Sequence, residues 1–354
     1  MGARAAARAI DALRRGWPIR LAGAQGALTL LPIEGATGES LAAFDPAAQA
    51  PLLISATRAV TLKLVNQLAA ADIQAPVLLA RDRWIDGPAA AMAIADPVTD
   101  LATPFKGPFR ALPLPHSDAA HAALSLARLA GLLPAYFVGA DDAPVEADCS
   151  IADVESFTDH ARLTIAARAR LPIAAKVDAE IVAFRSPEDP QEHIALILGA
   201  RDETAPVVRL HSECLTGDVL GSLKCDCGPQ LHAALHEIAE ASWGVLLYLR
   251  QEGRGIGLIN KLRAYQLQDQ GFDTVDANTR LGFAVDARDF GVAARMLDLL
   301  GIRQVRLLTN NPAKVAGLEA QGITVAERLP LALPSNPHNE RYLATKRDRT
   351  GHDL

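Results

Sequence analysis

Short apolar runs alternate along the chain with segments whose apolar residues recur at helical spacing. Such runs are typical of buried strands, and helical spacing is typical of helices that cover a sheet. In the first half, the predicted helices are 57–71 and 117–130, and the predicted strands are 76–80 and 135–139. Ser117 or Asp118 suits the N-cap of the second helix, and Gly131 suits its end.

The second half continues the same alternation. The predicted strands are 180–185, 193–198, 207–211, 244–249, 305–308 and 323–327, and the predicted helices are 230–241, 258–270, 289–300 and 313–321. Strands interleaved with helices predict an α/β or α+β protein with a mixed sheet in each half.

A polar and acidic segment separates the two halves. Residues 141–148 carry several acidic side chains and one proline. Ser150, with Asp153 three residues later, resembles a capping box, and we expect the helix that it opens to reach about Arg168. A chain of 354 residues also favours two domains. We therefore predict domains at 1–145 and 171–354, joined by a linker helix at 146–170.

Composition and charge exclude several classes of protein. The formal net charge is −6, so no overall basic field favours nucleic acid. No apolar run approaches the roughly 20 residues that a membrane helix needs. Residues 1–16 carry four arginines, as transit peptides do, but their apolar spacing and the stop at Gly16 favour a plain amphipathic helix. We expect a cytoplasmic protein that binds neither nucleic acid nor membrane.

The cysteines are few and clustered. Cys214, Cys225 and Cys227 form the pattern C-x10-C-x-C, and Cys149 stands alone near the linker. Four cysteines in a chain of this length do not make a disulfide framework, so the cluster indicates metal binding or catalysis. Cys149 is expected to be a buried structural residue.

Three readings of the cluster remain open from its spacing. Three thiolates with a vacant fourth position are typical of a catalytic zinc, which lowers the pKa of its bound water toward about 7. A fourth ligand from His211 or His232 would instead make a closed, structural zinc site. Simple packing of three cysteines is the third reading, and the polar neighbours of the cluster weaken it.

Two further segments suit an anion. Gln251–Leu258 is rich in glycine, follows a predicted strand and precedes a helix, so its backbone N–H groups and Arg254 suit a phosphate, although a plain turn explains the glycines equally well. In 309–314, Thr309 and Asn310 suit a helix cap. Lys314 falls in the first turn, against the helix dipole, and this placement favours phosphate contact.

Together these motifs resemble GTP cyclohydrolase II. The resemblance covers about 171–354 and rests on 209–228, 250–258, 273–278, 307–312 and 336–342. It implies an enzyme that converts GTP to a diamino-ribosylamino-pyrimidinone phosphate, formate and pyrophosphate at the first step of riboflavin synthesis. It also implies one zinc ion per chain, Mg²⁺ with the triphosphate, and a homodimer.

The resemblance assigns roles to individual positions. The family's zinc ligands match Cys214, Cys225 and Cys227. Its proposed general base matches Asp286, its proposed nucleophilic arginine matches Arg288, and its active-site tyrosine matches Tyr265. From spacing alone, Asp286 is a helix cap and Arg288 a surface charge. The family's GTP-binding positions match Arg209, Leu210, His211, Ser212, Glu213, Gln230, Glu252, Gly253, Arg254, Thr274, Thr309 and Lys314.

Chemistry fits these residue types. Guanine C8 lies between two ring nitrogens and is electrophilic, so activated water attacks it and a second hydration releases formate. Arg, Lys and Mg²⁺ stabilise the charge that develops as pyrophosphate leaves. Glu252 suits guanine N1–H and the 2-amino group, because a carboxylate accepts from two adjacent donors. Arg288 acts either as a covalent nucleophile or by electrostatic stabilisation.

The first half resembles a degenerate dihydroxybutanone-phosphate synthase. Residues 9–16 resemble that family's opening helix and 126–134 its late helix. Its acidic metal-binding loop is replaced by 22–27, and its metal-binding histidine falls at Ala119, with His116 and His121 out of register. We expect this half to be inactive, because an Mg²⁺-dependent rearrangement needs those ligands.

Two other functions stay open. One is a cyclohydrolase-like enzyme with an altered product, such as one that keeps the pyrophosphate. The other is a zinc-stabilised GTP-binding module without turnover.

Overall fold

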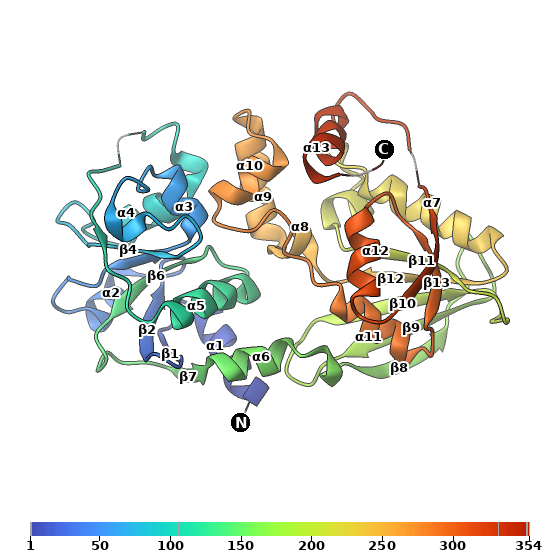
Figure 1. The fold of residues 1–354 in the computed structure, drawn as a ribbon, viewed down its shortest axis with the longest axis horizontal. Helices are drawn as coiled ribbons and strands as arrows, with labels where there is room; N and C mark the ends of the chain where they lie inside the picture. Colours follow the sequence, from blue (N-terminus) through green and yellow to red (C-terminus); the bar gives the residue numbers. More distant parts are fainter. Residues whose placement is uncertain (1, 105, 332, 352, 354) are drawn as a thin grey trace. The chain divides into compact units, whose positions relative to one another are not determined.

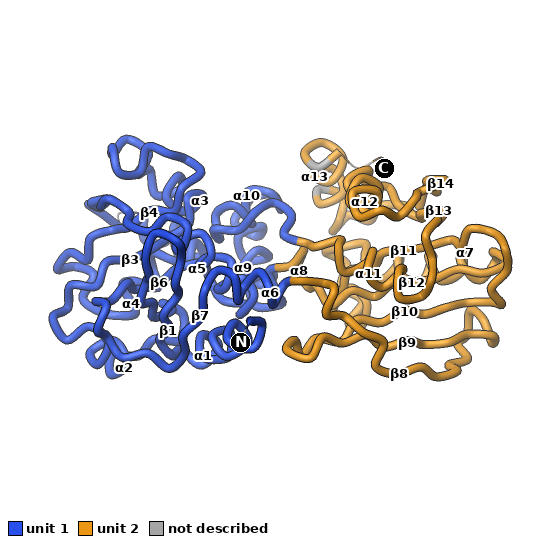
Figure 2. Tube along the Cα trace, turned by 60° about the horizontal axis from the view of Figure 1, so that its bottom comes forward, with its two compact units in different colours: residues 1–158, 256–287 blue, residues 159–255, 288–354 orange. Residues whose placement is uncertain are grey.

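The computed structural model describes residues 2–104, 106–331, 333–351 and 353. It divides into two compact units, coloured separately in Figure 2. Unit 1 contains Met1–Thr158 and Ile256–Ala287, and unit 2 contains Asp159–Gly255 and Arg288–Leu354. Each unit has one seven-stranded sheet with helices beside it (Figure 1), which confirms the predicted α/β class with two mixed sheets.

The sheet of unit 1 has the strand order β5-β4-β3-β6-β2-β1-β7, and only β1 and β7 pair in parallel. Its strands are β1 (Ile19–Ala22), β2 (Ala27–Pro32), β3 (Leu52–Ile54), β4 (Val77–Leu79), β5 (Ala111–Leu112), β6 (Ala135–Gly139) and β7 (Ala147–Ser150). Successive side chains point to opposite faces, so Tyr136 and Phe137 of β6 enter two different cores.

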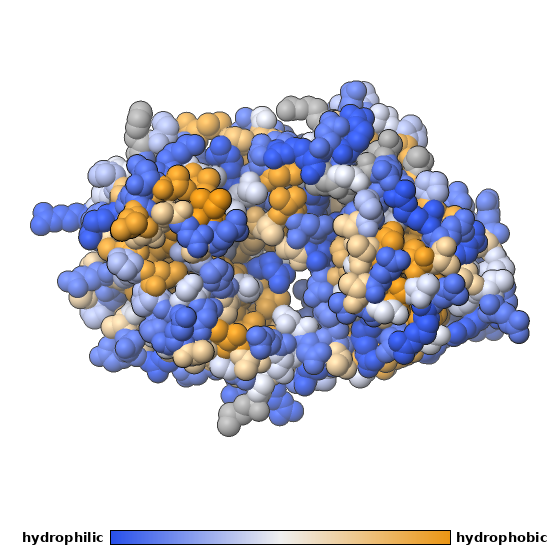
Figure 3. All heavy atoms as spheres, in the orientation of Figure 1, coloured by the Kyte–Doolittle hydropathy of each residue, from blue (hydrophilic) through white to orange (hydrophobic). Residues whose placement is uncertain are grey.

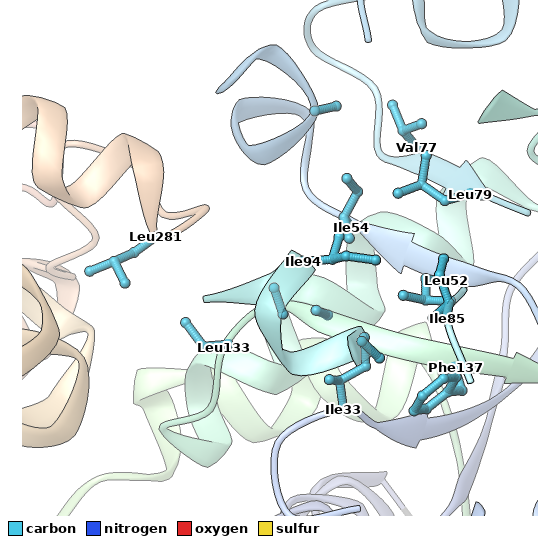
Figure 4. Close-up of a cluster of buried hydrophobic side chains, with 14 of the residues drawn as sticks. Ile33, Leu52, Ile54, Val77, Leu79, Ile85, Ile94, Leu133, Phe137 and Leu281 are labelled. Carbon is cyan, nitrogen blue, oxygen red and sulfur yellow. The ribbon is translucent and has the colours of Figure 1, made fainter. Parts of the chain in front are cut away.

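Helices cover both faces of this sheet. They are α1 (Gly2–Arg14), α2 (Gly38–Phe44), α3 (Ala56–Thr61), α4 (Pro88–Ala95), α5 (Ser117–Ala130), α6 (Ile151–Thr158), α9 (Gly257–Asp269) and α10 (Thr274–Arg280), with 3₁₀ turns η1 (Leu68–Ala70) and η2 (Pro97–Thr99). Helices α1 and α5 pack into the core around Tyr136. The core around Phe137, drawn in Figure 4, takes side chains from α4 and from Leu281 after α10.

The predicted helix 57–71 is wrong beyond its first turns. Helix α3 ends at Thr61, Lys63 has the left-handed φ of 64°, and η1 follows as a separate turn. Leu64 is buried, but Val65 is 41% and Leu68 is 96% exposed. Figure 3 shows hydrophobic surface in the area of α3. Here helical periodicity reflects a surface patch and not a core-facing helix.

The sheet of unit 2 has the order β14-β13-β11-β12-β10-β9-β8. The first four strands run parallel and the last four antiparallel. The strands are β8 (Thr164–Arg170), β9 (Ala179–Arg185), β10 (Glu192–Leu198), β11 (Val207–Ser212), β12 (Gly244–Leu249), β13 (Gln304–Leu308) and β14 (Thr324–Leu329).

Helices also cover both faces of the sheet of unit 2. The elements are the 3₁₀ turn η3 (His160–Arg162), the π-helical turn η4 (Leu215–Val219), α7 (Cys227–Glu240), the irregular turn α8 (Glu252–Gly255), α11 (Gly291–Leu299), α12 (Pro312–Glu319) and α13 (Glu340–Thr350). Helix α7 packs on one face, and α11 and α12 pack on the other. The predicted strands and helices of this half match these elements within a few residues.

The expected linker helix is shorter than predicted. Ser150 and Asp153 do form the reciprocal capping contacts, but α6 ends at Thr158. The segment Thr164–Arg170 pairs with β9 as an edge strand instead of continuing the helix. Pairing with the next strand along the chain therefore overrides the helical pattern of this segment. In the described part of the chain, none of the helices has the length and apolar character that a membrane span requires.

Candidate metal and nucleotide site

The carboxyl ends of three parallel strands bring the candidate segments together in unit 2. The cysteine loop follows β11, the glycine-rich segment follows β12, and Thr309–Lys314 follows β13. The carboxyl ends of parallel strands meet at one edge of a sheet, which is where open α/β sheets bind ligands.

The three clustered cysteines converge. Their sulfur atoms all lie within 4.8 Å of one another, with 3.7 Å between Cys214 Sγ and Cys225 Sγ. Cys214 and Cys225 are buried and Cys227, the first residue of α7, is half-buried. Cys149 lies on β7 of unit 1, and burial raises the pKa of its thiol to about 12, so it behaves as a structural residue.

Backbone closes around the sulfur atoms at Gly217. A Cβ there would stand 2.8 Å from Cys225 Sγ, 2.9 Å from Cys227 Cβ and 3.1 Å from Cys214 Sγ. The Gly217 N–H donates to Cys214 Sγ at 3.3 Å. Only glycine fits this space, and the N–H group stabilises negative charge on sulfur.

Crowding makes the trio unfavourable without a cation. Hydrogen bonds with Cys214 and Cys225, together with burial, raise the pKa of the Cys227 thiol well above its usual value. Three thiolates in this space therefore require a positive charge among them. Soft sulfur ligands in such a set suit zinc.

Neither histidine proposed for a closed site joins the sulfur atoms. Among the described residues, the group with metal-ligand spacing consists of the three cysteines alone. His211 Nε2 pairs with Asp218 Oδ1 at 3.0 Å, and His232 Nδ1 pairs with the Gly228 carbonyl at 2.9 Å. The arrangement therefore favours three protein ligands over four.

Asp218 organises the loop that carries Cys214. Its side chain is 2% exposed, and Oδ2 accepts from the Cys214 N–H at 3.0 Å and from the Tyr248 hydroxyl at 2.9 Å. Burial is the main cause that lowers the pKa of His211, so a neutral His211 with its proton on Nε2 donates to Asp218. Three donors thus hold this carboxylate, and one of them is the backbone N–H of Cys214.

Asp226, between Cys225 and Cys227 in the sequence, belongs to a second buried network. Lys346 Nζ of α13 donates to Asp226 Oδ1 at 2.7 Å, and Gln230 Nε2 donates to Asp226 Oδ2 at 2.6 Å. Gln230 Oε1 accepts from Arg209 at 2.5 Å. The chain of contacts therefore runs from the C-terminal helix α13, through the cysteine loop, to a buried arginine on β11.

Two polar side-chain atoms of β11 lack hydrogen-bond partners among the described residues. Arg209 Nε and Ser212 Oγ are buried and make no hydrogen bond with any described residue. Burial also lowers the pKa of Arg209 to about 10, a value at which the guanidinium stays charged at neutral pH. Unpaired buried donors need an explanation, and a polar ligand at this edge provides one.

The glycine-rich segment adopts a left-handed turn. Gly253 and Arg254 have φ values of 62° and 60°, and for Arg254 this backbone conformation is strained. Glu252 Oε2 accepts from the Leu215 N–H at 2.7 Å, and Oε1 accepts from the Gly253 N–H. Glu252 therefore lies beside the cysteine loop, with its carboxylate engaged by two backbone groups.

Lys314 occupies a buried position at the same edge. It is 6% exposed, and its Nζ donates to the Leu210 carbonyl at the end of β11. Asn311, not Thr309 or Asn310 as predicted, caps α12 by accepting from the Ala313 N–H. Thr309 instead accepts from the Asn311 N–H. After β11, Glu213 Oε2 accepts from Arg250 Nε at 2.8 Å.

Three expected site residues fold with unit 1. Tyr265 lies on α9, 5.8 Å from Lys261 Nζ to its ring centroid, and Thr274 begins α10 and accepts from Gln268. Asp286 is exposed in the segment that follows α10. Arg288 is in unit 2, with its guanidinium 5.5 Å from the Phe290 ring centroid.

Sequence reasoning missed Asp218, Asp226 and Lys346. Asp218 and Asp226 stand beside the cysteines, and an acidic residue there was a detectable signal. Lys346 lies 120 residues from Asp226, and no local pattern connects the two.

Replacing Gly217 with alanine tests the fit around the sulfur atoms. The added Cβ overlaps two cysteines, and overpacking of this kind costs about 1–3 kcal/mol of unfolding free energy. We expect weaker zinc binding in chelator competition and a lower unfolding midpoint. The control is Gly38→Ala, because a Cβ at Gly38 meets nothing within 4 Å. Equal zinc affinity in both variants would contradict the close fit.

Replacing Lys346 with methionine tests the second network. Asp226 would lose a buried cation between two ligands, and loss of such a supporting contact lowers metal affinity by about 10- to 100-fold. Chelator competition measures this change. Arg347→Met is the matched control, because its side chain is 59% exposed. Identical zinc affinities in the two variants would rule out a role for Lys346.

Known proteins resemble this chain in the same region. A family model described as GTP cyclohydrolase II matches residues 164–330. A protein of Azotobacter vinelandii named GTP cyclohydrolase-2 is 63% identical over 165 residues, which cover 46% of this chain and 79% of that protein. The riboflavin biosynthesis protein RibBA of Bacillus subtilis is 55% identical over 177 residues, and the match spans less than half of that protein, 44% of its length.

A solved structure, described as RibBX, a two-domain 3,4-dihydroxy-2-butanone 4-phosphate synthase from A. baumannii, has 19% identity and a TM-score of 0.31, with 93% of this chain and 99% of that one covered. A likeness at that level carries no conclusion. A protein of Azospirillum brasilense named GTP cyclohydrolase-2 is 41% identical over 367 residues, which cover 99% of this chain and 94% of that protein. Since this match extends over nearly all of both proteins, the chain belongs to the GTP cyclohydrolase II family.

Proposed function

We propose that the protein is a zinc-dependent GTP cyclohydrolase of riboflavin biosynthesis. It opens the imidazole ring of guanine at C8 and releases formate and pyrophosphate, leaving 2,5-diamino-6-ribosylamino-4(3H)-pyrimidinone 5′-phosphate. The observation that carries this proposal is the trio of sulfur atoms within 4.8 Å, at the edge where Arg209, Arg254 and Lys314 also lie.

Cys214, Cys225 and Cys227 would hold the zinc ion. When bound there, zinc supplies a Lewis acid that makes water nucleophilic near neutral pH. The chain contributes the shape of the site: Asp218 fixes the backbone of Cys214, and the Gly217 N–H supports the charge on its sulfur. These contacts keep the three ligands in place before substrate arrives.

The cationic side chains bind the triphosphate, with Mg²⁺ as its counter-ion. Arg209 is oriented by Gln230 and by the Leu308 carbonyl, so its unpaired Nε is the group that remains for a ligand. Arg254, on a strained turn of glycines, brings a second guanidinium, and Lys314 and Thr309 act at the end of β13. Cationic side chains beside the phosphate oxygens stabilise the negative charge of the leaving pyrophosphate.

The guanine ring is recognised by Glu252, whose carboxylate accepts from N1–H and the 2-amino group. This role requires Glu252 to exchange its contact with the Leu215 N–H for the base. Leu210, His211, Ser212, Glu213 and Gly253 complete the GTP-binding set, and Thr274 belongs to it by family resemblance. Asp286 accepts protons and Tyr265 orients the reacting group. Arg288 acts either as a covalent nucleophile toward the phosphoryl group or by stabilising the charge that develops on it.

The N-terminal half is proposed to be inactive as a dihydroxybutanone-phosphate synthase. The segment 23–26 folds onto Asp118, whose Oδ2 accepts from the Ala24 N–H at 2.7 Å, and onto the ring of His116, which would stand 2.2 Å from a Cβ at Gly26. In the described part of unit 1, no three acidic or histidine side chains have metal-ligand spacing. The Azospirillum relative, which aligns with both halves, is named only as GTP cyclohydrolase-2.

We also propose that the protein acts as a cytoplasmic homodimer. The resemblance implies the dimer, and the exposed hydrophobic residues after α3, such as Leu68 at 96% exposure, suit a surface that contacts a partner.

Turnover of GTP is the direct test. Purified protein with GTP and Mg²⁺ is expected to release formate, pyrophosphate and the pyrimidine product. A zinc chelator is expected to stop turnover, and added zinc is expected to restore it. Cys225→Ala is expected to abolish turnover, whereas Cys149→Ala, which removes a thiol from unit 1, is expected to retain it. Formate without pyrophosphate would support the altered-product enzyme, and GTP binding without formate would support the binding module.

A second assay tests the N-terminal half. We expect no dihydroxybutanone phosphate from ribulose 5-phosphate and Mg²⁺, because the metal ligands are missing. Liquid chromatography with mass detection measures the product, and an active dihydroxybutanone-phosphate synthase serves as the positive control. Product formation that depends on this protein would contradict the expectation.

A further inference from the structure

Two helices of the family-matched segment belong to unit 1, and the rest of that segment belongs to unit 2. The segment Ile256–Ala287, here called the hairpin segment, contains α9 and α10 and belongs to unit 1 (Figure 2), although it lies inside the matched residues 164–330. The N-terminal half therefore forms one compact unit with a piece of the cyclohydrolase sequence.

Apolar packing joins the hairpin segment to the N-terminal sheet. Its buried residues share a single core with side chains of β3, β4 and β6, and Figure 4 draws Leu281 among them. The residues that it contributes are Ile256, Ala264, Leu267, Ala277, Leu281 and Phe283. Helices of 13 and 7 residues are marginal alone in water, so this core is what stabilises them.

A charged contact sets the position of α9. Arg263 donates to both oxygens of Glu34, at 2.8 and 3.2 Å, and its Nε donates to Asp96 at 3.2 Å. The three side chains are between 14% and 19% exposed. A guanidinium that bridges two mostly buried carboxylates fixes direction as well as distance.

Further contacts lie along the length of the hairpin segment. Asn260 is fully buried and donates to the Gly131 carbonyl at 3.2 Å, and Gln270 donates to the Val98 carbonyl at 2.8 Å. Beyond α10, a Cβ at Gly282 would stand 2.6 Å from Ser55 Oγ. The N-terminal half thus contacts the beginning of α9, its end and the segment after α10.

We propose that the N-terminal half is a docking platform that keeps the hairpin segment folded and oriented for catalysis. The orienting part rests on the proposed function, since the hairpin segment carries Tyr265 and Thr274 and ends next to Asp286. Arg263 precedes Tyr265 by two residues on α9. Glu34 is a positioning residue that acts through Arg263. In this proposal, the N-terminal half has a structural role that needs no metal ligands of its own, because the hairpin segment packs on it.

Glu34→Ala in the full chain tests the platform, with Glu39→Ala as the matched control on an exposed position of the same half. We expect amide hydrogen exchange in 256–287 to become about tenfold faster in Glu34→Ala, and to stay unchanged around the cysteines. Zinc content should stay equal in both variants. Exchange in 256–287 equal to that of wild type would overturn the proposal.

Measurement of kcat then tests whether the N-terminal half orients the hairpin segment in addition to keeping it folded. We expect kcat for formate release to fall about tenfold in Glu34→Ala with zinc bound, and Glu34→Asp to recover part of it. The double variant with Arg263→Met should be no slower than Arg263→Met alone, because Glu34 acts through that residue. Faster exchange with unchanged kcat would overturn the orienting role. Absence of formate release in the wild type would defeat the proposed function and leave the exchange result standing by itself.

Discussion

The crowding of three sulfur atoms against the backbone of Gly217 is the constraint on which the rest of the site depends. With all three sulfurs within 4.8 Å, ionised thiols repel one another and neutral thiols lack charge to bind a metal tightly. A cation resolves this conflict, and the missing side chain at position 217 leaves the space in which the loop closes. The carboxyl edge of the sheet then determines which side chains lie beside the three sulfur atoms.

Two buried carboxylates connect this loop with the surrounding structure. Asp218 joins it to His211 and Tyr248 at the ends of β11 and β12, and Asp226 joins it to Lys346 on α13. A buried charge is tolerated only when it is paired and hydrogen-bonded, so each carboxylate demands a fixed set of donors. The same demand orders Gln230 and Arg209, so the cysteine loop, Lys346 and Arg209 form one continuous network.

Unit 1 combines the N-terminal half with residues from a much later part of the chain. Its sheet has two cores, and one of them is completed by residues that lie more than a hundred positions later in the chain. That core is built on strands β3, β4 and β6 and includes no residue of the loop 22–27.

The sequence by itself determined strands β9–β14 and helices α7, α11 and α12 of unit 2, the trio of cysteines and the family, because these elements and motifs follow from local patterns. It also placed α5 correctly, with Gly131 at its end. It was wrong for 57–71, where apolar residues at helical spacing lie on an exposed surface, and for the end of α6, where pairing with β9 prevails.

Only the tertiary structure decided where α9 and α10 pack, that Lys346 reaches Asp226, and that Asp218 holds Cys214. The physical reason is that burial and charge pairing act between side chains brought together by folding, and Glu34 and Arg263 are 229 residues apart. Local periodicity contains no information about partners at that distance.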